Sequence, residues 1–172
     1  MNKPDAIEFH TFAVLVDNEA GVLARVIGLF SGRGYNIESL TVAEVNKRDN
    51  LSRITIVTSG TPSVIEQIRA QLERLVPVHA VSDLTVEGPH VERELALVKV
   101  VGTGEARVES LRIADIFRSR VVDSTNESFV FEIVGDTGKL DAFIRLMEPL
   151  GLCSVARTGV AAMSRGPGSM EG

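Results

Sequence analysis

The chain has 172 residues, 44% of them hydrophobic and 24% charged, and a formal net charge of -5. This composition is ordinary for a globular protein of one domain or two small ones. The acidic balance, the lack of tryptophan and the single tyrosine argue against nucleic-acid binding. The one cysteine, Cys153, cannot form an internal disulfide and is expected to be a buried small side chain in a reducing compartment. The sequence has neither an apolar run of membrane-spanning length nor a signal-peptide core, so a cytoplasmic protein without a membrane partner is expected.

Hydrophobic periodicity predicts strands and helices in the order βαββαβ along the first half. The predicted elements are a strand over 11–16, a turn over 17–21, a helix over 22–33, a hairpin of strands 37–45 and 51–58, a helix after 60–62 and a strand over 78–86. Pro62 stands at the start of the second helix and Pro77 just beyond its end, as helix boundaries favour. The first half therefore has the pattern of one compact α+β unit.

The second half repeats this order more loosely. The predicted elements are a strand over 95–101, a helix over 106–118, a hairpin of strands 120–123 and 128–134, a helix ending at Pro149 and a strand over 152–161. Two βαββαβ units predict an α+β fold of two ferredoxin-like sandwiches, with domains at 1–88 and 89–163 and a flexible tail at 164–172. The sheet face without helices is also apolar in each unit, so dimerisation through those faces is expected.

The turn before the first helix has the features of an anion site. A strand that passes through a glycine-containing turn into a helix leaves backbone N–H groups free at the turn. Such groups bind a small anion, for example a carboxylate. No nucleophile or acid–base pair accompanies the turn, and His10, His79 and His90 are too far apart in sequence for a metal site. The pattern favours binding without catalysis.

Several long motifs resemble one protein family. The first half, from Thr11 to about Val86, looks like an ACT domain, a βαββαβ module that binds amino acids at paired interfaces. The whole chain resembles the acetohydroxyacid synthase (acetolactate synthase) small regulatory subunit. The motifs that carry the resemblance are Asp17-Asn-Glu-Ala-Gly21, the run from Arg25 to Ala43, Leu51-Ser-Arg-Ile-Thr55, Val91-Glu-Arg-Glu-Leu95, Gly138-Lys-Leu-Asp-Ala-Phe143, Ala156-Arg-Thr-Gly-Val160 and Ser164-Arg-Gly166.

The resemblance implies a regulatory subunit without catalytic residues. Its partner would be the large catalytic subunit of a transferase, which carries thiamine diphosphate, magnesium and FAD, while this chain would hold no cofactor. The small subunit would activate that enzyme and confer feedback inhibition by valine, or a related amino acid, in branched-chain amino-acid biosynthesis. An alternative is a free-standing amino-acid-sensing ACT protein that regulates another target. A small enzyme is the weakest alternative, since no catalytic group stands out.

The resemblance also implies a valine site between the ACT units of a homodimer, with a turn from one unit and a strand from the other. Five of the site residues have a structural alternative: a helix cap for Asn18, a conformational need for Gly21, the core for Val22 and Leu23, and a turn for Asn36. The implied ligand contacts are Asn18, Gly21, Val22, Leu23, Asn36 and Ile37, the last as an apolar wall. The second half lacks this pattern. We therefore expect the first unit to sense the ligand and the second to tune activation.

Overall fold

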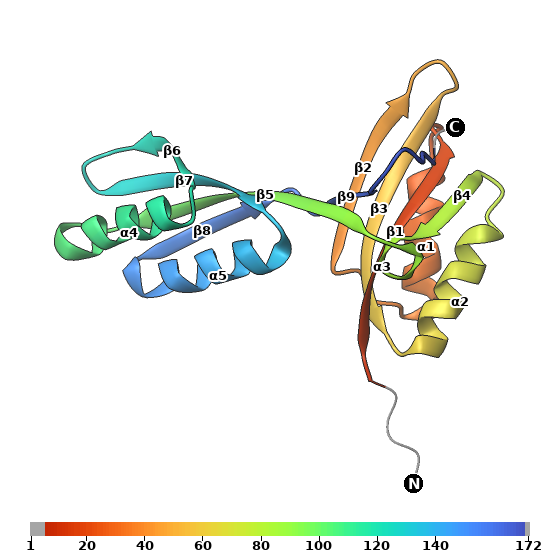
Figure 1. Cartoon of the computed structure of the whole chain (residues 1–172), viewed down its shortest axis with the longest axis horizontal. Helices are drawn as coiled ribbons and strands as arrows, with labels where there is room; N and C mark the ends of the chain where they lie inside the picture. Colours follow the sequence, from red (N-terminus) through yellow and green to blue (C-terminus); the bar gives the residue numbers. More distant parts are fainter. Residues whose placement is uncertain (1–5, 171–172) are drawn as a thin grey trace, which may run out of the picture. The chain divides into compact units, whose positions relative to one another are not determined.

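The computed structural model describes residues 6–170, which form two compact units. The first unit runs up to Val91 and takes in the C-terminal segment from Val160, and the second is Glu92–Gly159. Each unit is an antiparallel sheet with two helices on one face (Figure 1). This architecture confirms the predicted α+β fold of two ferredoxin-like sandwiches.

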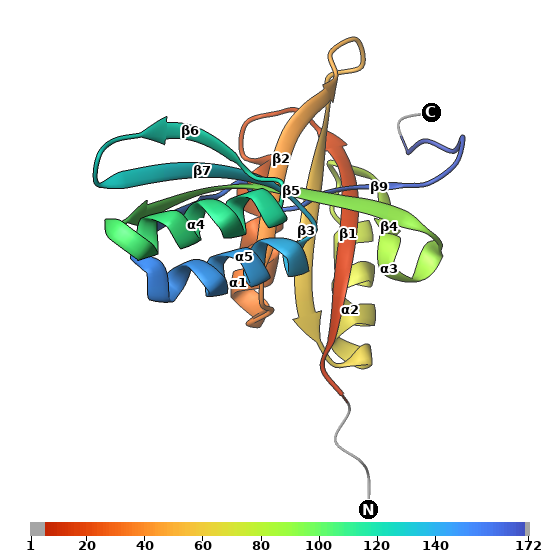
Figure 2. The same ribbon diagram turned by 60° about the vertical axis from the view of Figure 1, so that its left-hand side comes forward.

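In the first unit, the central strand is buried on both faces. Its elements are β1 (Glu8–Asp17), α1 (Val22–Arg33), β2 (Ser39–Asn46), β3 (Leu51–Gly60), α2 (Pro62–Glu73), β4 (Val78–Asp83) and α3 (Leu84–Glu87). The sheet order is β2-β3-β1-β4, so β2 lies at an edge, and Figure 2 shows β1 beside β3 in the middle. Phe12 and Val14 of β1 pack with Val26 and Phe30 of α1 in the core under the helices. This packing fixes the height of α1 above the sheet and so the place of its first turn.

In the second unit, the same plan recurs in the sheet order β6-β7-β5-β8. Its elements are β5 (His90–Val101), α4 (Gly104–Ile116), β6 (Arg120–Ser124), β7 (Ser128–Gly135), α5 (Thr137–Met147), a 3₁₀ turn (Glu148–Leu150) and β8 (Leu152–Arg157). The ring of Phe131 meets Phe143 edge-on, with centroids 6.0 Å apart. None of the helices between residues 6 and 170 is both long enough and apolar enough to cross a membrane.

The last predicted strand is divided in the structure. β8 ends at Arg157, and Gly159 has a φ of 86°, a left-handed conformation that turns the chain out of the second sheet. The next strand, β9 (Ala161–Ser164), pairs with β5 and belongs to the first unit. The observed division therefore differs from the expected domain at 89–163 and tail at 164–172. Residues 1–5 and 171–172 of the expected segments lie outside the described residues.

The segment 160–165, here called the C-terminal return, lies on the sheet face opposite the helices of the first unit. Val160 and Ala162 are buried with Ala13 of β1 and Leu84 of α3, and Met170 packs against the same cluster. Figure 1 shows β9 crossing near β2 and β3. This face is therefore not left bare as the sequence pattern suggested, because the chain's own C-terminal return covers part of it, and dimerisation through the rest of the face stays a prediction.

Polar side chains of β2 and β3 hold the backbone of the C-terminal return. The Val160 N–H donates to Ser39 Oγ at 2.8 Å, and Thr41 Oγ1 donates to the Val160 carbonyl at 3.0 Å. Arg53 Nη2 donates to the Ala162 carbonyl at 2.6 Å. These bonds satisfy backbone groups that would otherwise be buried without partners.

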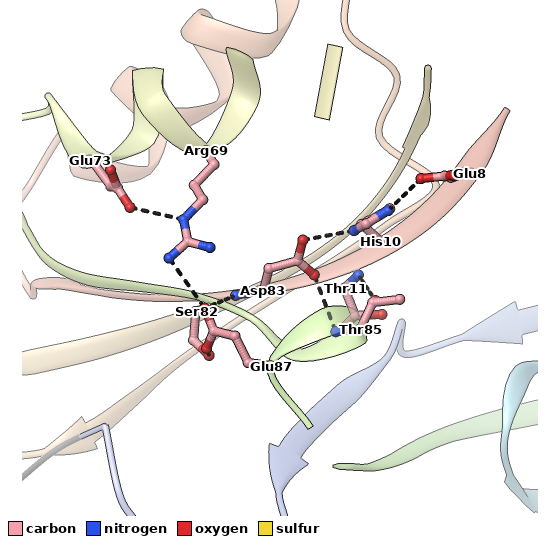
Figure 3. Close-up of polar contacts among 9 residues, drawn as sticks. All are labelled: Glu8, His10, Thr11, Arg69, Glu73, Ser82, Asp83, Thr85 and Glu87. Carbon is pink, nitrogen blue, oxygen red and sulfur yellow. Dashed lines mark hydrogen bonds and ion pairs between the residues drawn. The ribbon is translucent and has the colours of Figure 1, made fainter. Parts of the chain in front are cut away.

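The helix α3 replaces the end of a predicted strand over 78–86. Asp83 ends β4 and caps α3, since its Oδ1 accepts from the Thr85 N–H at 3.1 Å while Glu87 Oε1 accepts from the Asp83 N–H at 3.2 Å. Asp83 Oδ2 lies 2.7 Å from Nδ1 of the buried His10 (Figure 3). Two reciprocal side-chain bonds thus outweigh the β propensity of this segment.

On the sheet face of the second unit opposite its helices, several apolar side chains are exposed within the described residues. Leu97, Val101 and Val134 remain exposed. Cys153 is exposed as well, which corrects the expectation of a buried thiol. It falls at the register shift between the pairs Lys99–Ser154 and Val100–Leu152, so it has no partner across the ladder.

Candidate ligand-binding site

The turn that leads into α1 leaves a backbone donor open. Gly21 is the N-cap with a φ of 87°, and no side chain caps the helix. The Val22 N–H donates to the Glu19 carbonyl at 3.4 Å, whereas the Leu23 N–H has no hydrogen-bond partner among residues 6–170. Of the two predicted donors, the structure therefore leaves that of Leu23 available, at the positive end of the helix dipole. Val22 itself is buried in the core.

Asn18 does not cap the helix but is bonded to β3. Its N–H donates to the Asn50 carbonyl at 2.8 Å, and its carbonyl accepts from Asn50 Nδ2 at 3.2 Å. Its side-chain Oδ1 accepts from the hydroxyl of buried Ser52 at 3.0 Å. Within the described residues, the amide Nδ2 is the one polar group of Asn18 without a partner. Ser52 was not among the predicted residues.

Whereas Asn18 is held by its amide oxygen, Asn36 is held by its amide nitrogen. Its carbonyl accepts from Thr58 Oγ1 at 2.5 Å, and its Nδ2 donates to Ser59 Oγ at 3.2 Å and to Glu38 Oε1. Ser59 Oγ also donates to Glu38 Oε1 at 2.8 Å. The side-chain Oδ1 of Asn36 has no partner in residues 6–170. Glu38 and Ser59 were missed by sequence reasoning.

The six predicted residues form two groups at opposite ends of one sheet. Asn18, Gly21, Val22 and Leu23 lie at the end of the sheet where β3 starts, near Ser52, whereas Asn36 and Ile37 lie where β3 ends, near Ser59. Ser52 and Ser59 are seven residues apart on one strand, or about 23 Å at the rise of an extended chain. Ile37 is half-buried and packs against the first core. One copy of the chain thus carries two separate halves of the predicted site.

Two clusters of arginine ion pairs elsewhere have structural roles. In the second unit, Arg157 donates to both carboxylate oxygens of buried Glu94 at 2.8 and 2.7 Å and to Asp141 at 2.7 Å. The hydrogen bond to Glu94 is the main reason that the pKa of the Arg157 guanidinium is raised above its ordinary value. A bidentate pair of this kind ties strands β5 and β8 to α5.

In the first unit, Arg69 of α2 donates to Glu73 at 3.0 Å and contacts Glu87 of α3 at 3.3 Å (Figure 3). The bond to Glu73 is the largest cause of the raised pKa of Arg69. The residues between 6 and 170 contain no group of three His, Cys, Asp or Glu side chains arranged to hold a metal.

Comparison with known proteins assigns the family. A model of the small subunit of acetolactate synthase matches residues 93–166, and a model of the AHAS small subunit-like ACT domain matches residues 12–80. A probable acetolactate synthase small subunit from Archaeoglobus fulgidus is 50% identical over 157 residues, covering 91% of this chain and 97% of that protein. The chain belongs to the acetolactate synthase small-subunit family.

Other members of the acetolactate synthase small-subunit family are similar to this chain over nearly the same length. The isozyme 3 small subunit of Escherichia coli is 49% identical over 155 residues, covering 90% of this chain and 94% of that protein. The crystal structure of the small subunit from Thermotoga maritima superposes with a TM-score of 0.82 at 38% identity, covering 93% of this chain and 99% of the other. The ACT model spans both halves of the predicted site, and the small-subunit model extends over the C-terminal return.

Proposed function

We propose that this chain is the non-catalytic regulatory subunit of acetolactate synthase, binding and activating the large catalytic subunit and inhibiting it when valine is bound. The observation that carries the valine site is the complementary pair of half-sites. One end offers N–H donors from Leu23 and the Asn18 amide, and the other offers the Asn36 amide oxygen. Family membership supports the large subunit as the partner.

The arrangement of the first sheet supports a ligand site shared between two copies. β2 is an edge strand, and its end at Asn46 lies opposite Leu51, near Asn18, while its start at Ser39 follows Asn36. Antiparallel pairing of β2 with β2 of a second copy would place each Asn36 end beside the partner's Asn18 end. A two-fold axis then completes two equivalent sites. We propose this homodimer in place of one formed through the sheet faces.

Each part of an apolar amino acid has a counterpart in the assembled site. The carboxylate would meet the N–H donors at the start of α1, the ammonium would meet the Asn36 oxygen, and the branched side chain would lie along Ile37. Valine has about eight non-hydrogen atoms, so a ceiling of about 1.5 kcal/mol per atom limits its binding free energy to about 12 kcal/mol. Dissociation constants from micromolar to millimolar are expected, a range suited to a metabolite sensor.

The catalytic groups would all be supplied by the large subunit. We expect thiamine diphosphate, magnesium and FAD to be bound there and this chain to hold none of them. The turn at the start of α1 and Asn36 both belong to the first unit, so that unit would sense valine and the second would tune activation. The cytoplasm is the expected location of the complex.

Calorimetry on the isolated chain tests the sensing function. We expect saturable binding of valine and no formation of acetolactate from pyruvate, even with thiamine diphosphate and magnesium added. Acetolactate made by the pure chain would refute a non-catalytic role. The alternative of a free-standing ACT regulator predicts that no large subunit co-purifies with the chain, whereas our proposal predicts that it does.

The dimer gives a second prediction. Val42 of β2 is 43% exposed on the edge strand, and Val42→Lys should raise the dimer dissociation constant by about tenfold or more, because a charged side chain disfavours edge-to-edge pairing. Val76→Lys is the matched control, since Val76 is 94% exposed between α2 and β4. Analytical ultracentrifugation at micromolar concentration measures both. A wild-type chain that stays monomeric with and without valine would contradict the shared site.

A further inference from the structure

We propose that Ser52 and Glu38 hold the two asparagine amides with opposite ends toward the ligand, so that the site accepts a zwitterion in one orientation and rejects 2-oxo acids. This inference rests on the proposed valine site. A primary amide has one accepting and one donating end, so an asparagine can face either a carboxylate or an ammonium. Which end faces the ligand depends on the neighbours that hold the other.

Ser52 holds the oxygen of the Asn18 amide at the carboxylate end. Its hydroxyl donates to Asn18 Oδ1 at 3.0 Å, while Asn50 holds the backbone of Asn18 on both sides. Ser52 is only 4% exposed, so its hydroxyl has little access to water and its bond to Asn18 is shielded. The Nδ2 of Asn18 is left as a donor with no partner in the described chain, which suits a carboxylate.

At the other end of the site, Glu38 fixes the Asn36 amide by its nitrogen, so that the oxygen faces the ligand. Its Oε1 accepts from Asn36 Nδ2 and from Ser59 Oγ, and Ser59 Oγ accepts from the same Nδ2 at 3.2 Å. The Oδ1 of Asn36 therefore remains as the open acceptor among the described residues. The negative charge of Glu38 lies beside it. An acceptor next to a carboxylate favours an ammonium group and disfavours a second anion.

The two residues thus act as positioning residues with separate effects on the ligand. Ser52 supports recognition of the carboxylate, and Glu38 supports recognition of the ammonium. A 2-oxo acid such as pyruvate has a carboxylate but no ammonium, so it satisfies one end and brings no donor to the Asn36 Oδ1 beside the Glu38 carboxylate. Since the proposed partner enzyme consumes pyruvate, this arrangement of the two amides would keep its substrate out of the regulatory site.

Three ligands separate these roles in the full chain. Valine carries both charged groups, 3-methyl-2-oxobutanoate lacks the ammonium, and valinamide lacks the carboxylate. NMR titrations, which follow weak binding, should show the wild-type chain binding each analogue at least about tenfold more weakly than valine. Ser52→Ala should weaken valine and the oxo acid by about tenfold and leave valinamide unchanged. Glu38→Gln should weaken valine and valinamide by a similar factor and leave the oxo acid unchanged or slightly tighter.

Matched controls and a rescue distinguish positioning from a general structural effect. Ser110→Ala removes a buried hydroxyl in the second unit, and Glu66→Gln neutralises an exposed carboxylate on α2. Both should bind all three ligands as the wild type does, and Ser52→Thr should restore the binding lost in Ser52→Ala. If the wild type binds valine but the two variants affect all three ligands equally, or none, the inference is overturned and the sensing function stands. If the wild type does not bind valine, the sensing function itself fails, and this inference fails with it.

Discussion

Replacing Gly21 with aspartate should abolish inhibition by valine while activation of the large subunit persists. Gly21 caps α1, and a Cβ built on it meets no atom within 4 Å, so the new side chain would have room beside the Leu23 N–H. Its carboxylate would then stand where the ligand carboxylate should bind. Two like charges about 4 Å apart repel by about 4 kcal/mol near a protein surface. The concentration of valine needed for half inhibition should rise by about a hundredfold or more.

Gly21→Asn is the control for this substitution. Asparagine has nearly the shape of aspartate and tolerates a positive φ better than most residues, so it reproduces the steric change without the charge. It should raise the half-inhibition concentration by about tenfold at most. Inhibition would be measured as acetolactate formation by the reconstituted enzyme over a valine titration. If Gly21→Asp remained fully sensitive to valine, the carboxylate site would not lie at this turn.

Replacing Val160 with aspartate should destabilise the first unit by about 3 kcal/mol or more. Val160 is 3% exposed and packs with Ala13 and Leu84, and burial of an unpaired carboxylate there is costly. Met163→Asp on β9 is the matched control, because Met163 is 62% exposed, and it should change stability by less than about 0.5 kcal/mol.

Hydrogen exchange of the β1 and β3 amides measures this loss, since these strands form the centre of the first sheet. The second unit has its own core around Phe131 and Phe143, so its amides should keep their protection in Val160→Asp. Equal protection of β1 in the two variants would show that the C-terminal return does not stabilise the first unit.

Elements with strong periodicity could be predicted from the sequence. The helix predicted over 22–33 is α1 with the same limits, because its apolar stripe and the glycine that ends it act locally. The end of β4 could not be predicted in this way. There, the bonds of Asp83 with Thr85 and Glu87 stabilise α3. The strand predicted over 152–161 was too long, because no local pattern in the sequence indicates that the chain leaves the second sheet at Gly159.

Only the part of the candidate site that depends on local sequence could be predicted. The turn from Asn18 to Gly21 is visible in sequence, because a strand, a glycine and a helix follow one another. The contact of Ser52 with Asn18 spans 34 positions and depends on the pairing of β1 with β3, in which Asp17 lies opposite Leu51. Ser52 lies within the motif Leu51-Ser-Arg-Ile-Thr55, but nothing in that motif shows that its hydroxyl contacts Asn18. The ligand contacts themselves remain predictions.

Reconstitution with the large subunit tests the central claim most directly. Acetolactate formation from pyruvate would be measured for the large subunit alone, for this chain alone, and for the two together with and without valine. We expect the chain alone to be inactive, the mixture to be several-fold faster than the large subunit, and valine to remove most of that gain. A mixture no faster than the large subunit and indifferent to valine would contradict the account.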